Sequence, residues 1–170
     1  MRAMIGCALA ALVLSTTGVL AASDTGTATV TILRPLTVTK NTDLKFGTVV
    51  EPSSGSADVT ISAAGARTTT LDVGGAAFGA STFTVAGEDG QAVTVSAPTS
   101  FAIANQNGPG SLTVTTTGNT SNTGAQTLAG GTGLGSGGTL LVSVGGKITV
   151  LSTTASGLYS GTFTVSASYN

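Results

Sequence analysis

Residues 158–170, the last thirteen of the chain, read LYSGTFTVSASYN and point most directly to the fold. Apolar and aromatic side chains recur there at odd-numbered positions, with Ser and Thr occupying much of the other set. Successive side chains of a β-strand point to opposite faces, so this alternation predicts a half-buried strand. Five side chains share its apolar face: Tyr159, Phe163, Val165, Ala167 and Tyr169.

The same alternation continues upstream. Residues 27–33 (TATVTIL) place Ala28, Val30 and Ile32 on one face, with threonine between them, which is typical of a strand. Further short strands are predicted over residues 36–39, 44–50, 57–62 and 68–73.

Two hairpins are predicted from glycine-rich turns. The first has Gly87-Glu88-Asp89-Gly90 between two alternating runs, and the second has Gly145-Gly146 between residues 140–144 and 148–150. Matching the apolar sides of the second hairpin favours a three-residue loop, 145–147, with a bulge. Residues 118–138 are weakly patterned and are predicted to form a long loop or edge region.

These patterns predict an all-β protein. Many short strands, regularly spaced turns and the lack of helical periodicity favour an immunoglobulin-like (pilin-type) β-sandwich. A β-solenoid is the alternative for a chain rich in Gly and Thr, but no fixed repeat period is found.

The composition argues against catalysis. Only 8% of the 170 residues are charged, and there is no histidine, which rules out a Ser-His-Asp triad and a His-ligated zinc site. Glu88 and Asp89 are adjacent at a predicted turn and are expected to solubilise it. We therefore expect no enzyme activity, no cofactor and no metal site. The formal net charge of −1, without a basic cluster, also argues against nucleic-acid binding.

The N-terminus has the layout of a secretory signal peptide over residues 1–21. Arg2 gives a positive start, residues 5–14 are apolar, and Val19-Leu20-Ala21 suits a signal peptidase, with Ala22 as the alternative cleavage position. A membrane anchor is the alternative, but the apolar run is too short for a span. Cleavage would remove Cys7, the single cysteine, and leave no membrane span.

Residues 22–35 are predicted to be an N-terminal extension, and residues 36–170 a sandwich domain. Ala28, Val30 and Ile32 would form the first strand of the chain's own sandwich or an arm that completes the sandwich of a neighbour.

The sequence resembles chaperone–usher pilus subunits. An alternating arm follows the signal peptide, Asp43-Leu44-Lys45-Phe46-Gly47-Thr48 looks like the first-strand "L-x-F-G" segment, Tyr169 is penultimate, and Gly157 is fourteenth from the C-terminus. Together the features look most like uncharacterised bacterial secreted domains found in fimbria-like settings. Unlike many pilins, the cleaved chain would carry no disulfide.

The resemblance implies a sandwich that lacks its final strand and exposes an apolar groove. A periplasmic chaperone would contact the C-terminal strand, with the expected groove and chaperone residues Gly157, Phe163, Val165, Ala167 and Tyr169. At an outer-membrane usher, the arm of the next subunit would replace the chaperone. The implied product is a homo-polymer, or a polymer with other pilus subunits, at the cell surface. The alternative is a self-complete secreted β-sandwich with a surface or adhesion role. Sugar binding by stacked aromatics is disfavoured by the lack of Trp and by only two Tyr.

Overall fold

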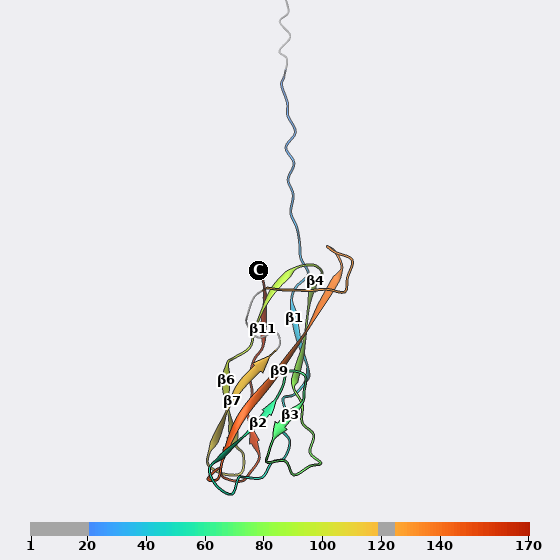
Figure 1. Ribbon diagram of the computed structural model, residues 1–170. Helices are drawn as coiled ribbons and strands as arrows, with labels where there is room; N and C mark the ends of the chain where they lie inside the picture. The colour runs from blue at the N-terminus through green and yellow to red at the C-terminus, as the bar shows by residue number, and fades with distance from the viewer. Residues whose placement is uncertain (1–20, 119–124) are drawn as a thin grey trace, which may run out of the picture. The chain divides into compact units, whose positions relative to one another are not determined.

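The computed structural model describes residues 21–118 and 125–170, and within them all regular secondary structure is β (Figure 1). The chain divides into two units, Met1–Thr31 and Ile32–Asn170, and the strands lie in the second. The predicted signal peptide lies outside the described residues except for its last position. The strands are β1 (Thr37–Thr42), β2 (Ser56–Ile61), β3 (Arg67–Thr69), β4 (Ser81–Glu88), β5 (Ala92–Ser96), β6 (Ser100–Asn105), β7 (Ser111–Gly118), β8 (Gln126–Thr127), β9 (Gly137–Leu151), β10 (Tyr159–Ser160) and β11 (Ser166–Tyr169).

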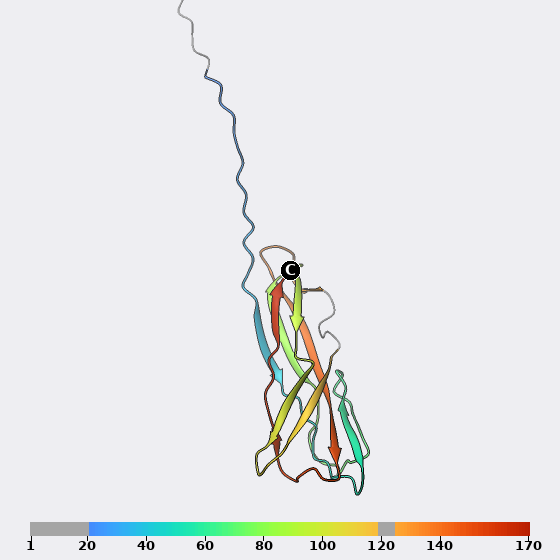
Figure 2. The same cartoon turned by 90° about the vertical axis from the view of Figure 1, so that its left-hand side faces the viewer.

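Two antiparallel sheets form the Ile32–Asn170 unit (Figures 1 and 2). The larger sheet has eight described strands in the order β1-β4-β9-β7-β6-β10, with β2 paired to both β9 and β3. The smaller sheet has the order β11-β5-β8. The predicted all-β sandwich is confirmed.

The predicted hairpin around Gly145-Gly146 is wrong, because β9 is one continuous strand of 15 residues. Its first half pairs with β4, its second half with β2, and residues 144–147 with β7 on the other side. The two glycines permit close packing rather than a turn. A Cβ on Gly145 would lie 2.2 Å from the carbonyl oxygen of Ile61, and one on Gly146 would lie 2.9 Å from a methyl carbon of Val114.

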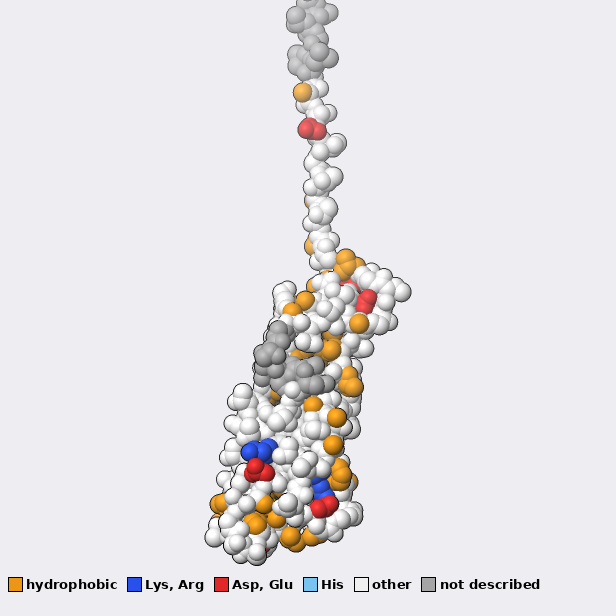
Figure 3. Space-filling view, viewed as in Figure 1, with side chains coloured by type: hydrophobic (Ala, Val, Ile, Leu, Met, Phe, Trp, Pro, Cys, Tyr) orange, Lys and Arg blue, Asp and Glu red, His pale blue; other side chains and the backbone are white. Residues whose placement is uncertain are grey.

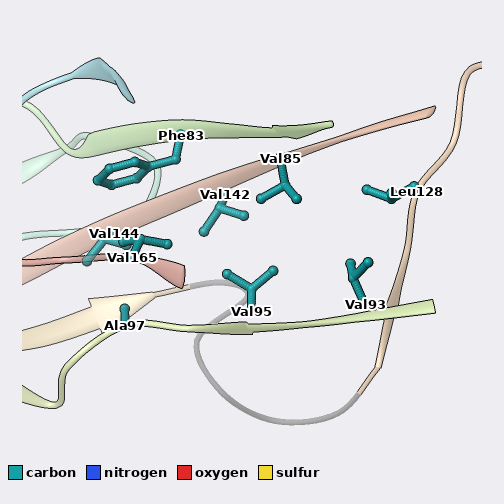
Figure 4. Packing of buried hydrophobic residues seen from close by; sticks show 9 residues of the cluster. All are labelled: Phe83, Val85, Val93, Val95, Ala97, Leu128, Val142, Val144 and Val165. Atoms are coloured by element: carbon teal, nitrogen blue, oxygen red, sulfur yellow. The ribbon is translucent and has the colours of Figure 1, made fainter. Parts of the chain in front are cut away.

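The predicted hairpin at Gly87–Gly90 is also wrong. β4 pairs with β1 and β9, whereas β5 pairs with β8 and β11, so this turn carries the chain from one sheet to the other. Phe83 and Val85 therefore face Val93 and Val95 across the sandwich interior (Figure 4). A hairpin within one sheet and a turn that joins two facing sheets both require one apolar face per strand. Their sequences therefore show the same alternation on either side of a short turn.

The sequence analysis missed the hairpin of β6 and β7. Phe101 pairs with Val114, and Ile103 with Leu112, on either side of a turn that contains Asn107-Gly108-Pro109-Gly110. Both strands alternate and the turn residues are typical, so the signal is present in the sequence.

The predictions for the other strands hold in part. Strands β1, β2 and β3 each begin within one residue of a predicted start, at 36, 57 and 68. However, β3 ends after three residues. Residues 44–50 form two isolated bridges instead of a strand. Residues 27–33, although they alternate, form no strand and pair with none of the strands in the described part of the chain. The region 118–138, where described, is mainly irregular and contains the short strand β8.

The predicted C-terminal strand is interrupted. Its first part, β10, pairs with β6 of the larger sheet, and its last part, β11, pairs with β5 of the smaller sheet. Residues 161–165 cross between the sheets, and this crossing ends the ladder. At Gly161 a Cβ would lie 2.4 Å from the carbonyl oxygen of Ala102, so only glycine fits this approach.

Most of the buried apolar side chains form two clusters, one in each half of the larger sheet. The first is enclosed between the larger and the smaller sheet: Phe83, Val85, Val93, Val95, Ala97, Leu128, Val142, Val144 and Val165 (Figure 4). The second is made of Val59, Leu71, Ile103, Val114, Ile148 and Val150. The second cluster contains no residue of the smaller sheet, and irregular segments pack against it instead.

Candidate functional site

An apolar groove lies over the second cluster. Its volume is about 1060 Å³, and its floor includes Ile103, Val114, Ile148 and Val150 from three strands of the larger sheet. Its walls are residues 43–51, which are irregular, and residues 154–163, which are irregular except for the short strand β10; we call them the first and second walls. The groove thus occupies the half of the larger sheet that the smaller sheet does not cover.

The first wall is held by few backbone contacts. Leu44 and Phe46 pack against the second cluster. Lys45 exchanges backbone hydrogen bonds of 2.9 Å in both directions with Gly79. Gly47, with a φ of 80°, turns the chain in a conformation that favours glycine.

Arg67 anchors the first wall to β3. Its side chain is 4% exposed and donates a 3.0 Å hydrogen bond to the carbonyl oxygen of Phe46. The guanidinium also pairs with Asp72 and lies 4.4 Å from the ring centroid of Phe78. A buried guanidinium needs such partners, so this contact set fixes the position of the first wall. The sequence analysis did not identify Arg67, because nothing local marks a single arginine as buried.

The second wall is fixed by β6. Gly157, with a φ of 150°, lies against Asn105, and a Cβ there would be 2.3 Å from the Asn105 amide oxygen. Asn105, 8% exposed, donates to the carbonyl oxygen of Ser156 at 3.3 Å. Phe163 stacks on Phe101 with ring centroids 4.8 Å apart, and both rings line the groove.

The structure divides the predicted C-terminal site residues into two groups. Gly157 and Phe163 line the groove. Val165 belongs to the enclosed first cluster, and Ala167 and Tyr169 pack against that cluster from β11. Only the first two are therefore brought together at the groove.

The remaining predicted site residues, Ala28, Val30 and Ile32, belong to the exposed N-terminal segment. Val30 is 82% exposed and Ile32 83%, and Ala28 is also exposed. Most of the surface of Val30 and Ile32 is thus accessible to water.

Both sheets end in an edge strand that can accept another strand. The larger sheet ends at β1, all of whose residues are exposed, and the smaller sheet ends at β11. An edge strand presents unpaired backbone N–H and C=O groups, to which an extended segment can bind.

Charge contributes little to the surface. On the face in Figure 3 most side chains are uncharged. Each of the two blue groups lies beside a red one, and the other red side chains have no blue neighbour in this view. At the groove, a 2.6 Å hydrogen bond from Lys40 lowers the pKa of Asp43 below its usual value. A group of three or more potential metal-ligating side chains is absent from the described residues. Nor do those residues include a helix long and apolar enough to cross a membrane.

Comparison with curated proteins gives no match. A domain family described as a domain of unknown function, DUF4402, matches residues 36–169 and so covers the whole sandwich, including the groove, from just before β1 to the end of β11. The chain belongs to the DUF4402 family.

Proposed function

We propose that this protein is a structural subunit of a surface fimbria or pilus, assembled by donor-strand complementation through a chaperone–usher pathway. The observation that carries the proposal is the open apolar groove over the second cluster. Its walls come from the two segments, 43–51 and 154–163, on which much of the resemblance to pilins rests. The occupant we propose is the N-terminal segment of another copy, with Ala28, Val30 and Ile32 entering the groove.

The chemistry of the two parts is complementary. The groove floor is aliphatic, and the N-terminal segment presents aliphatic side chains at every second position. Strand addition supplies main-chain hydrogen bonds for affinity, and pockets for alternate side chains give specificity. Because each copy has one donor segment and one groove, head-to-tail addition that does not close into a ring yields a fibre.

The same features require protection before assembly. An open apolar groove with free strand edges is prone to aggregation. A periplasmic chaperone is therefore the partner proposed for the newly exported subunit, and an outer-membrane usher the place of exchange. The protein would cross the inner membrane with the signal peptide and end at the cell surface.

Two matched variants test the donor. Val30→Asp with Ile32→Asp places two charges on the apolar face, and Thr29→Asp with Thr31→Asp adds the same charge to the other face, which is also exposed. Burial of one Val or Ile side chain contributes about 1.5–3 kcal/mol. Loss of both weakens association by roughly 10²- to 10⁴-fold, at about 1.4 kcal/mol per tenfold.

Oligomers of the purified protein are measured by size-exclusion chromatography with light scattering. We expect the wild type and the Thr29/Thr31 variant to form oligomers and the Val30/Ile32 variant to stay monomeric. The monomeric variant keeps an empty groove, so a peptide of residues 24–33 should bind it and raise its Tm. If all three proteins are monomers and the peptide does not bind, the proposal is wrong.

A second candidate is a self-complete secreted surface protein. The enclosed first cluster favours it, because the smaller sheet already covers half of the larger sheet without a donor. In that case the two aspartate variants would behave alike, and the peptide would leave the Tm unchanged.

A further inference from the structure

Three residues form a polar cluster around the buried carboxylate of Glu88 at one end of β4. Glu88 is 1% exposed, its Oε2 accepts from the backbone N–H of Arg34 at 3.2 Å, and the Arg34 side chain lies 3.7 Å away. The hydroxyl of Tyr169 donates to the Arg34 carbonyl oxygen at 2.8 Å and accepts from the Glu88 N–H at 2.7 Å. We call Arg34, Glu88 and Tyr169 the clasp.

The surroundings of the clasp are shaped for it. A Cβ on Gly87 would lie 2.4 Å from the Tyr169 hydroxyl oxygen, so only glycine leaves room for that group. The other carboxylate oxygen of Glu88 accepts from the backbone N–H of Gly135, and Arg34 donates to the Gly135 carbonyl oxygen at 2.8 Å. A buried carboxylate is tolerated when paired and hydrogen-bonded in this way, and removing its partners is destabilising.

We propose that the clasp prevents the N-terminal segment from filling the groove of its own chain, and so reserves that segment for another copy. This inference rests on the proposed function. The clasp is a positioning device, and it acts by fixing Arg34 at the end of β4 that lies away from the groove.

The reach of the chain supports this role. Phe83 is the groove residue nearest to Glu88 along β4, five residues away, or about 17 Å at the rise of a strand. With Arg34 fixed beside Glu88, two residues extend at most about 7 Å to Ile32, and four extend about 14 Å to Val30. Neither side chain can enter the groove while the clasp is closed. Ala28, six residues from Arg34, reaches about 21 Å and so only the edge of the groove at Phe83, which means that the three donor side chains cannot fill the groove together.

Opening the clasp lengthens the distance that the N-terminal segment can span. The first position held by strand pairing is then Thr37, which pairs with Ala86, three residues or about 10 Å from Phe83. Ile32 is five residues from Thr37 and reaches about 17 Å, which is enough to enter the groove. Self-insertion is unimolecular and would compete with association at low concentration.

The test uses Glu88→Gln with Tyr169→Phe in the full chain, exported, purified and refolded without other proteins. We expect a cooperatively melting monomer in place of oligomers, and at least tenfold weaker binding of the peptide of residues 24–33. Adding Val30→Asp and Ile32→Asp to this variant should restore peptide binding, because the groove is then empty. If the double variant has no cooperative melt, Tyr169→Phe alone, which keeps the ring, is used in the same way.

The outcomes separate the two proposals. If the clasp variant forms oligomers like the wild type, or its monomer binds the peptide as tightly as the Val30/Ile32 variant does, the clasp has no such role although the proposed function stands. If the wild type is itself monomeric and the Val30/Ile32 variant does not bind the peptide, the proposed function fails, and this inference fails with it.

Discussion

Gly145→Ala tests the description of β9 as one strand packed closely against its neighbours. Gly145 is buried where β9 passes the end of β2. Its Cβ would lie 2.2 Å from the Ile61 carbonyl oxygen and 2.8 Å from the Thr117 hydroxyl oxygen. The Ile61 oxygen belongs to the backbone of a fully buried residue, so it cannot move without shifting β2.

Overpacking of this kind destabilises a core by about 1–3 kcal/mol, and the backbone contact places Gly145→Ala near 3 kcal/mol. For a domain of this size, 1 kcal/mol lowers the Tm by about 3–5 °C, so the expected loss is roughly 9–15 °C. The measurement is thermal unfolding followed by circular dichroism, with the Tm compared at equal protein concentration.

Gly137→Ala is the matched control on the same strand. No atom lies within 4 Å of a Cβ at this exposed position, and its φ is not positive. There the substitution is expected to raise stability by about 0.4–1 kcal/mol, because alanine restricts the unfolded chain. Equal Tm values for the two variants would refute the close packing of β9 against β2.

Two further predictions concern burial and charge. Leu128→Ala should lower the free energy of unfolding by about 2–5 kcal/mol in chemical denaturation, because Leu128 is fully buried. Leu134 is 65% exposed, so Leu134→Ala should have little effect. Equal effects of the two substitutions would contradict the placement of this region. Hydrogen bonds from Thr149 and Lys147 lower the pKa of Asp58 below its usual 3.8, so its contribution to stability is present above that value and is lost as pH falls through the lowered pKa. The Tm difference between the wild type and Asp58→Asn should therefore be seen at pH 6 and vanish at strongly acidic pH, and a difference that persists there would contradict the assignment.

The all-β class could be predicted because alternation is a local signal. Each strand needs one apolar face, and the pairs Phe83/Val85 and Val93/Val95 show it in the sequence. Which strands pair is a non-local property. The turn at 87–90 joins two sheets instead of two neighbouring strands, and Gly145 provides space instead of a turn; neither is visible without the partner segments.

The candidate site could be predicted only in part for the same reason. The terminal patterns singled out Gly157 and Phe163, and both line the groove, while their predicted role stays a prediction. The groove floor, the Arg67 anchor and the clasp depend on residues far apart in the chain. Tyr169 was predicted as a groove and chaperone residue because of its penultimate position. Its hydroxyl contacts with the backbone of Arg34 and Glu88 could not be predicted, because those residues are far away in the chain.

Disulfide trapping between two chains tests the central claim most directly. Cys7 is the single cysteine, so chains with Cys7→Ser and either Val30→Cys or Leu112→Cys each carry one thiol. Leu112 lines the groove, and a disulfide forms only when two Cα atoms come within about 7 Å. After mixing and mild oxidation, we predict a covalent heterodimer for this pair and none when Leu134→Cys, outside the groove lining, replaces Leu112→Cys. No heterodimer, or equal amounts with both partners, would contradict the claim that the groove binds the N-terminal segment of another copy.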